Sequence, residues 1–263
     1  MISVSKLEML TRIGFAARGV LYLSIGYLAL RFGETENHTG AIAFLAEGNG
    51  VYLVAVMAAG LLGYGFWRLS EAIADTEGQG TGAKGIAARA GGVVSGLVHF
   101  GLAFAAMNFA TGEGAAQGGG NEASLGAATA MEYPGGGLLV ILAGAALIGT
   151  GLWQLVNAAR ADFLKYLDRR AAGKPWVKWF GRAGYAARGI VFGIIGWSLF
   201  RAGAADEAEQ ANGIAQAIGM LSGTLFAAVA IGFVLFGLFS FVEARHRRIT
   251  DPKVLERLQR AIR

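Results

Sequence analysis

The stretch "RIGFAARGVLY", residues 12–22, occurs in three versions along this chain and decides its fold. It returns as "RAGGVVSGLVH" at 89–99 and as "RAGYAARGIVF" at 182–192, with the shared form R-x-G-x-x-x-[RS]-G-x-x-[YHF]. Each copy opens an apolar run long enough to cross the hydrocarbon core of a bilayer, which takes about 20 residues of helix. Repeats of this kind indicate that one structural unit is used several times.

A second motif closes the apolar run that follows each copy. It reads "GFWRLSEA" at 65–72, "GLWQLVNA" at 151–158 and "GLFSFVEA" at 237–244, evenly spaced and with the shared form G-x-[WF]-x-x-x-[EN]-A. Hydropathy therefore predicts an all-α integral membrane protein with six transmembrane helices. The predicted spans are 13–32, 51–73, 90–110, 137–158, 183–203 and 221–242.

Composition favours the membrane class. The 263 residues are 54% hydrophobic and only 16% charged, whereas soluble domains are about a quarter charged. The 42 glycines suit close packing of membrane helices. The helices of a soluble bundle would need polar faces, which these runs lack. The absence of cysteine excludes disulfides, thiolate metal sites and cysteine nucleophiles.

Charge sets the expected orientation. The segments 159–182 and 245–263 each carry seven basic residues against two acidic ones, a net charge of +5 each. The segments 33–50, 111–136 and 202–220 contain acidic residues and neither lysine nor arginine. The positive-inside rule places both termini in the cytoplasm and the three acidic loops outside. The basic balance is then topological, suits contact with anionic lipid at the cytoplasmic face and gives no reason to expect nucleic acid.

Each unit reads as helix, short external helix, helix. Because a unit holds two spans, all copies enter the membrane in the same direction, so these are parallel repeats related by an axis along the membrane normal. We therefore expect a pseudo-threefold bundle of helix hairpins. The short external, interfacial helices are predicted at 39–47, 122–132 and 211–220, and an interfacial amphipathic helix is expected within 164–179.

The expected organisation is a single membrane domain over 1–263. Its parts are repeat 1 at 10–75, repeat 2 at 84–160, repeat 3 at 180–245 and a basic cytoplasmic tail at 246–263.

The tripled glycine, arginine and aromatic pattern, together with the tripled G-x-[WF] helix end, resembles the bacterial membrane family called domain of unknown function 1206. In that family a two-helix membrane unit occurs three times per chain. The resemblance covers residues 10–245 and implies a multi-pass protein of the bacterial inner (plasma) membrane. It implies no activity, because the family is named for lacking one.

Charged residues inside the spans form a pattern of their own. Arg18 leans toward the cytoplasmic end of its helix, and Glu71, on a helix of opposite direction, leans back toward the same depth. Arg188 and Glu243 repeat this arrangement in the third unit. In the middle unit both charges are lost together, because Ser95 and Asn157 stand at those positions.

The joint loss predicts three intramembrane polar pairs. Within units these are Arg18–Glu71, Arg188–Glu243 and Ser95–Asn157, and pairing between neighbouring units fits the same pattern. We favour the interpretation that the pairs fasten adjacent helices. The alternative is an ion or substrate pathway, which intramembrane charges commonly mark.

Other candidates are weaker. Arg31 and Arg201, at the outer ends of their helices, suit interfacial snorkelling or contact with an anionic lipid headgroup. His99 stands where the other copies have Tyr22 and Phe192, which predicts a packed, hydrogen-bonded histidine and not a haem ligand. We predict no catalytic residue, no cofactor and no metal site.

The sequence thus predicts a non-enzymatic structural or interaction module, associated with lipid and with an unidentified membrane or cytoplasmic protein partner. The alternative is a small channel or transporter that conducts along the pseudo-threefold axis, with Ser95, Asn108 and Asn157 among its lining groups. A lipid- or quinone-modifying enzyme is least supported, because it needs a cluster of titratable groups in one leaflet.

Overall fold

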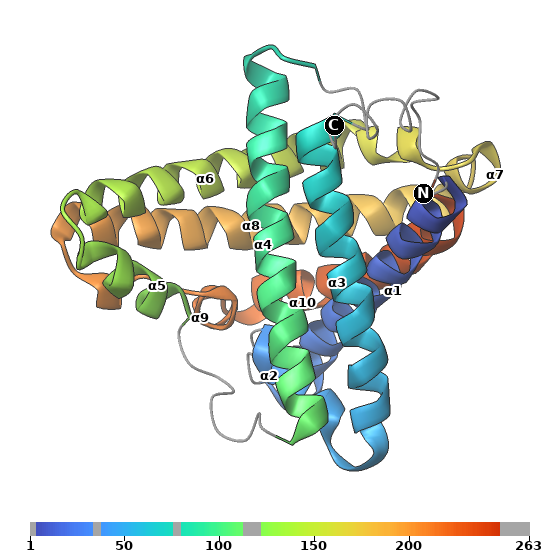
Figure 1. Cartoon of the computed structure of the whole chain (residues 1–263), viewed down its shortest axis with the longest axis horizontal. Helices are drawn as coiled ribbons and strands as arrows, with labels where there is room; N and C mark the ends of the chain where they lie inside the picture. Colours follow the sequence, from blue (N-terminus) through green and yellow to red (C-terminus); the bar gives the residue numbers. More distant parts are fainter. Residues whose placement is uncertain (1–3, 34–37, 76–79, 113–121, 248–263) are drawn as a thin grey trace.

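The computed structural model describes residues 4–33, 38–75, 80–112 and 122–247, and every regular element in these ranges is a helix (Figure 1). Six helices are long and apolar enough to cross a membrane, which confirms the predicted number and places. They are α1 (Val4–Phe32), α3 (Val51–Ala74), α4 (Ala83–Thr111), α6 (Gly136–Arg160), α8 (Pro175–Ala205) and α10 (Gly223–His246).

The three predicted short helices are present as α2 (His38–Ala46), α5 (Glu122–Met131) and α9 (Ile214–Gly219). Two 3-10 turns, Gly48–Gly50 and Ala208–Gln210, accompany them.

The interfacial helix expected within 164–179 is not a single element, so that prediction is wrong. A 3-10 turn at Asp162–Tyr166 is followed by α7 (Arg169–Ala172), and α8 then begins at Pro175. Asp168 caps α7 by accepting a 2.8 Å hydrogen bond from the Ala171 amide. Proline in the first turn suits the start of α8, since its missing amide hydrogen has no helical partner there.

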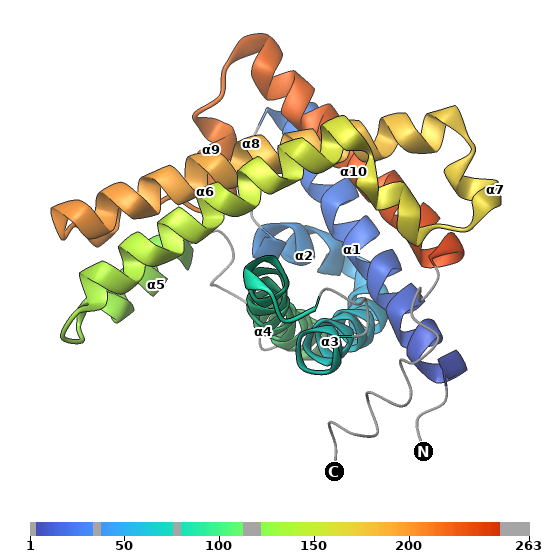
Figure 2. The ribbon, with the colours of Figure 1, turned by 90° about the horizontal axis from the view of Figure 1, so that it is seen from above.

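The closest helix pairs join different repeats. Each repeat consists of a first helix (α1, α4 or α8) and a second helix (α3, α6 or α10). The second helix packs antiparallel along the first helix of the next repeat, as α3 does on α4 and α6 does on α8 (Figure 2). The last second helix, α10, packs in the same manner on α1. Helix packing therefore brings the last membrane helix of the chain against the first.

Glycines explain the close approach at these three interfaces. Gly19 faces Gly237, Gly65 faces Gly96, and Gly151 faces Gly189, at equivalent positions of the two motifs. A methyl group on any of them would come within 2.8–3.1 Å of the carbonyl oxygen of the opposite glycine. Small residues allow this backbone contact, which supplies van der Waals packing between membrane helices.

Packing within a repeat is uneven. In repeat 1 a Cβ on Gly14 would lie 2.8 Å from Tyr64 Cα, and in repeat 3 a Cβ on Gly184 would lie 2.7 Å from Phe236 Cα. The equivalent Gly91 of repeat 2 has no such neighbour within 4 Å among the described atoms, and Val94 beside it is 62% exposed. Helices α4 and α6 therefore lack the interface that the other two repeats have.

The three helix pairs do not share one direction. In both views the α6–α8 pair runs across the α3–α4 pair (Figures 1 and 2). The common axis of the predicted pseudo-threefold bundle is therefore not confirmed. The largest buried cluster lies where α1, α8 and α10 meet and contains Tyr22, Val191, Phe233 and Phe236.

Exposed apolar side chains cover the outer faces of α4 and α6. A soluble monomer does not expose apolar surface on this scale without a partner, and lipid contact explains it. The residues are Val93, Val94, Leu97, Val98 and Phe104 on α4, and Leu138, Leu139, Leu142, Leu152 and Trp153 on α6.

Candidate functional site

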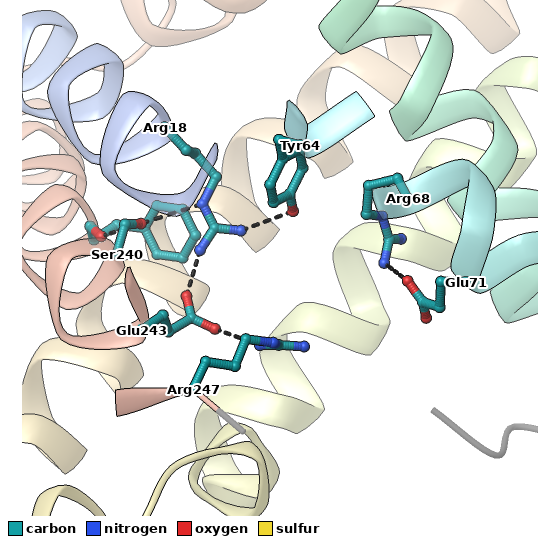
Figure 3. A network of polar contacts seen from close by, with 8 residues as sticks. Arg18, Tyr64, Arg68, Glu71, Ser240, Glu243 and Arg247 are labelled. Atoms are coloured by element: carbon teal, nitrogen blue, oxygen red, sulfur yellow. Dashed lines mark hydrogen bonds and ion pairs between the residues drawn. The ribbon is translucent and has the colours of Figure 1, made fainter. Parts of the chain in front are cut away.

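Arg18 is the centre of a buried polar cluster where α1, α3 and α10 meet (Figure 3). The helix places it one residue before Gly19, which contacts α10, and four residues after Gly14, which contacts α3. The two close approaches enclose the arginine, which is only 6% exposed.

Each nitrogen of the Arg18 guanidinium donates a hydrogen bond. Nε donates to Ser240 Oγ at 3.2 Å, and Nη1 donates to Tyr64 Oη at 3.1 Å. Nη2 forms an ion pair and hydrogen bond with Glu243 Oε2 (Figure 3). The charge is thus compensated by side chains from two other helices, as a cation in an apolar interior requires.

Glu243 is the acceptor for two arginines. It is 1% exposed, and its second oxygen, Oε1, accepts a 2.8 Å hydrogen bond from Arg247 Nη1, one turn further along the chain. Ser240 Oγ in turn donates to the Phe236 carbonyl at 2.9 Å. We call Arg18, Tyr64, Ser240, Glu243 and Arg247 the Arg18 network.

The within-repeat pairing of Arg18 with Glu71 is wrong, and the pairing between repeats is the one present. Glycine contact between α1 and α10 brings Arg18 and Glu243 to the same level. On α3 the residue opposite Arg18 is Tyr64. Glu71 lies seven residues beyond Tyr64, about 10 Å further along the helix.

Glu71 and Arg188 also have partners other than those predicted. Glu71 is buried and forms an ion pair with Arg68, three residues earlier on α3 (Figure 3). Arg188 forms no ion pair with Glu243, whose two oxygens are bonded to Arg18 and Arg247. The predicted pair Arg188–Glu243 is therefore wrong as well.

Aromatic rings surround the arginines. Arg18 Cζ lies 4.5 Å from the Phe15 ring centroid, and Arg247 Cζ lies 4.7 Å from the same ring. Phe236 is likewise shared, at 4.9 Å from Arg18 Cζ and 4.6 Å from Arg188 Cζ. Such cation–π contacts stabilise a desolvated guanidinium by about 2 kcal/mol each.

The predicted contact between Ser95 and Asn157 is absent. Their helices, α4 and α6, are those without a shared interface, and no hydrogen bond joins the two side chains in the described part of the chain. The Ser95 carbonyl instead lies 2.7 Å from His99 Nδ1, and the His99 ring centroid lies 4.4 Å from that of Tyr64. His99 is therefore packed and hydrogen-bonded, as predicted.

The first arginine of the motif caps a helix of the preceding repeat, a role that the sequence analysis missed. Arg89 donates to the Ala72 carbonyl at 2.6 Å and to the Ile73 carbonyl at 3.1 Å, at the end of α3. Arg182 donates to the Ala159 carbonyl at 2.8 Å, at the end of α6. Cations at a helix C-terminus bond the last carbonyls and oppose the helix dipole.

Three members of the Arg18 network also went unpredicted. Tyr64 directly precedes the glycine of the second motif, Ser240 follows that glycine by three residues, and Arg247 lies one turn beyond Glu243. The i, i+4 spacing of Glu243 and Arg247 was a usable signal. Tyr64 and Ser240 had no such signal, because the other copies of the second motif have different residues at these positions.

The two basic segments meet at the end of α10. The Asp168 amide donates to the His246 carbonyl at 2.9 Å, and His246 Nδ1 lies 2.8 Å from Asp168 Oδ2. This contact places the start of the predicted tail beside the 159–182 segment, and the rest of the tail lies outside the described residues. Arg31 and Arg201, the predicted outer headgroup contacts, are exposed on α1 and α8.

The cluster is rich in positive charge and poor in metal-binding side chains. Arg18, Arg68, Arg188 and Arg247 stand against two carboxylates, Glu71 and Glu243. Among the described residues no group of three or more histidine, cysteine, aspartate or glutamate side chains has a metal-binding arrangement. The arrangement is thus suited to holding helices together or to binding an anion.

Comparison with known proteins gives a family. The model described as "Domain of Unknown Function (DUF1206)" matches three stretches of the chain, residues 13–75, 90–161 and 183–247. A similar protein is "Uncharacterized protein YxxB" of Bacillus subtilis (strain 168), 29% identical over 255 residues, which cover 92% of each chain. No solved structure matches the chain.

Proposed function

The chain belongs to the DUF1206 family, and from this premise we propose that it is a structural or interaction module of the bacterial inner membrane. It performs no chemistry of its own in this proposal. Both termini face the cytoplasm, and the three repeats follow one another in a ring around a pseudo-threefold axis along the membrane normal.

The observation that carries the proposal is the use of both Glu243 oxygens. Oε1 accepts from Arg247 and Oε2 from Arg18, so the carboxylate joins the first repeat to the third. A general base or proton carrier needs a lone pair and a route to its partner. A buried carboxylate held by two guanidinium groups supports a fastening role instead.

The order of helix pairs supports the ring. At each of the three inter-repeat interfaces a glycine of the second motif meets a glycine of the first motif, and the third interface joins α10 back to α1. The same motif positions make the same contact three times, which supports repeats that follow one another in one order, although the crossing of the α6–α8 and α3–α4 pairs departs from a common axis.

The basic cytoplasmic face is the proposed contact surface. Trp176 and Trp179 are exposed at the start of α8, and Lys174 Nζ and Arg182 Cζ lie 5.7 Å and 5.3 Å from their rings. Tryptophan beside basic residues is typical of the interfacial zone of a bilayer. Anionic lipid is attracted there by about 1 kcal/mol per basic residue, and an acidic face of a protein partner fits the same surface.

The test measures lipid retention. The whole protein is reconstituted in nanodiscs with equal phosphatidylglycerol and phosphatidylcholine, and retained lipid is counted by native mass spectrometry. A charge-reduced variant, K165Q/K174Q/K178Q, loses about 3 kcal/mol of attraction at roughly 1 kcal/mol per lysine, so its affinity for phosphatidylglycerol is expected to fall by about 100-fold.

The comparison variant, R31Q/R201Q, alters the opposite end of the helices, where the predicted outer headgroup contacts lie, and is expected to lose less phosphatidylglycerol than the charge-reduced variant. Unchanged retention in the charge-reduced variant contradicts the surface contact. Ion flux in proteoliposomes that responds to replacement of Ser95 or Asn157 contradicts the structural role and favours the channel.

A further inference from the structure

We propose that Arg188 binds the phosphate group of an anionic ligand where α8 lies beside α1, α6 and α10. The proposal deepens the lipid association above by naming one buried site, and it rests on that function only in placing the site within the bilayer. It concerns residues separate from the basic cytoplasmic face.

The first argument compares Arg188 with Arg18, which occupies the same position in its own repeat. The glycine contact Gly189–Gly151 corresponds to Gly19–Gly237. The helix that packs beside Arg188 through this contact is therefore α6, just as α10 packs beside Arg18. The helix α10 gives Arg18 a hydroxyl and a carboxylate, Ser240 and Glu243. The residues at the same positions of α6 are Gln154 and Asn157, and neither carries a charge. Arg188 has thus kept its charge where the acid has been lost.

The second argument concerns the hydrogen-bond donors of Arg188 that the aromatic rings leave unsatisfied. Arg188 Cζ lies 4.6 Å from the ring centroid of Phe236, 5.1 Å from that of Phe192 and 5.3 Å from that of Tyr22. Rings interact with the faces of a guanidinium, whereas its five N–H groups point outward in the plane. No acceptor within the described ranges reaches Nε, although this atom is buried. The Nε–H group of Arg188 therefore remains an available donor.

Gln154 supplies an independent observation on the facing helix. Its side chain is 95% buried, since the residue is 5% exposed, and its Oε1 has no hydrogen-bond partner in the described chain. A buried amide without a partner is costly. Because the Gly151–Gly189 contact sets Gln154 level with Arg188, an unpaired acceptor on α6 and an unpaired donor on α8 stand at one level, where a third component would satisfy both.

The local charge fixes the sign of that component. Around Arg188 and the Arg18 network three arginines, Arg18, Arg188 and Arg247, stand with one glutamate, Glu243, so positive charge exceeds negative charge by two among these described residues. The Phe236 ring lies 4.9 Å from Arg18 Cζ and 4.6 Å from Arg188 Cζ, and the Phe15 ring lies 4.5 Å from Arg18 Cζ and 4.7 Å from Arg247 Cζ, so these charges are close together. Excess positive charge in an apolar region favours an anion.

A phosphate group matches the donor set best. The guanidinium fork binds phosphate through two parallel hydrogen bonds, and the delocalised cation is weakly hydrated, so it loses little on entering the site. The unpaired Gln154 oxygen then accepts from a hydroxyl of the ligand, which phosphatidylglycerol and protonated inorganic phosphate both carry. The shared chemistry is the phosphate, and its source is either a lipid headgroup or the free ion.

The experiment follows thermal unfolding of the whole protein in neutral detergent by the fluorescence of its five tryptophans. One arm adds phosphatidylglycerol in mixed micelles against equal phosphatidylcholine. The other adds inorganic phosphate against chloride at equal ionic strength. A ligand that binds the folded state raises the unfolding temperature in proportion to its saturation.

Two variants carry the test. R188Q removes the donor, and N157E places on α6 the carboxylate that Arg18 finds on α10, so the site is filled internally. We expect both to weaken phosphate-ligand binding by roughly tenfold or more. N157E is expected to unfold no more easily than wild type, which keeps the result readable if R188Q folds poorly. R160Q, an exposed arginine on α6, is the charge-matched control and is expected to bind as wild type.

Each outcome either supports or overturns the proposal that Arg188 binds a phosphate group. A shift with phosphatidylglycerol alone that is lost in N157E supports a lipid headgroup, and a shift with inorganic phosphate that is lost in N157E supports the free ion. Equal shifts in wild type and N157E, or no shift in either arm, overturn the proposal. The charge-reduced variant K165Q/K174Q/K178Q is expected to keep the Arg188 shift, so failure of the cytoplasmic contact and failure of this site are told apart.

Discussion

At the scale of single residues, the fate of an intramembrane charge depends on the helix it faces. Arg18 and Arg188 share a motif position and a neighbouring glycine. Arg18 finds Glu243 on α10, whereas the helix beside Arg188 offers Gln154. The joint loss of charge in the second repeat suggested pairs within a unit. It arises instead because that repeat supplies neutral groups to both of its neighbours.

A double-mutant cycle tests the residue-scale assignment. Because Arg18 and Glu243 are buried together, R18Q and E243Q are expected to destabilise by about 3 kcal/mol each and to show a coupling energy above about 1 kcal/mol. Free energies of unfolding are measured in mixed detergent–SDS micelles. The control cycle, R18Q with E71Q, is expected to couple by less than about 0.5 kcal/mol. Stronger coupling to Glu71 than to Glu243 refutes the assignment.

At the scale of elements, the two motifs are complementary parts of one joint between repeats. The glycines of both motifs bring the helices together, and the first-motif arginines Arg89 and Arg182 bond the carbonyls that end α3 and α6. The last carbonyls of a helix have no partner within the helix, and a basic side chain can supply one. The motif thus specifies contact with the preceding repeat as well as a membrane span.

Two glycines of α6 give a matched test of this joint. A Cβ on Gly144 would lie 2.6 Å from the Gly196 carbonyl oxygen, whereas Gly149 has nothing within 4 Å among the described atoms. We expect G144A to destabilise by about 1–3 kcal/mol through overpacking. G149A is expected to be neutral or stabilising by about 0.5–1 kcal/mol, because alanine favours helix. Equal effects in thermal unfolding would show that α6 and α8 do not pack as described.

At the scale of the whole molecule, the chain forms its strongest helix pairs by exchange between repeats. Each second helix packs most extensively on the first helix of the next repeat, and α10 packs on α1. The series of packed helices has no interface between α4 and α6, where Gly91 has no neighbour within 4 Å among the described atoms and Val94 is 62% exposed. These two helices belong to the repeat whose polar residues are neutral, so no ion pair is available to join them.

Disulfide formation tests this arrangement, and the absence of native cysteine leaves a clean background. A Cβ on Gly92 would lie 3.2 Å from Ala72 Cβ across α3 and α4, near the separation that a disulfide requires. In native membranes A72C/G92C is expected to cross-link rapidly under mild oxidation. The pair V94C/A146C replaces the residues of repeat 2 that correspond to Ala17 and Gly60, which touch each other in repeat 1. This pair is expected to remain reduced. Rapid cross-linking of V94C/A146C would show a closed second repeat.

The sequence by itself determined the helices and their number. Runs of about 20 apolar residues leave helix as the only way to satisfy the backbone in a bilayer, and the tripled motifs identified the repeats. It also identified Arg18, Glu71, Arg188 and Glu243 as buried or partly buried polar groups, since a motif position fixes a residue's level along its helix.

Only the tertiary structure decided which of these groups meet. Level along a helix does not specify the neighbouring helix, and the glycine contacts that select it join residues as distant as Gly19 and Gly237. The same limit hid Tyr64 and Ser240, whose side chains matter only because α3 and α10 both face Arg18. Partner choice is set by backbone approach between repeats, and no single repeat encodes that.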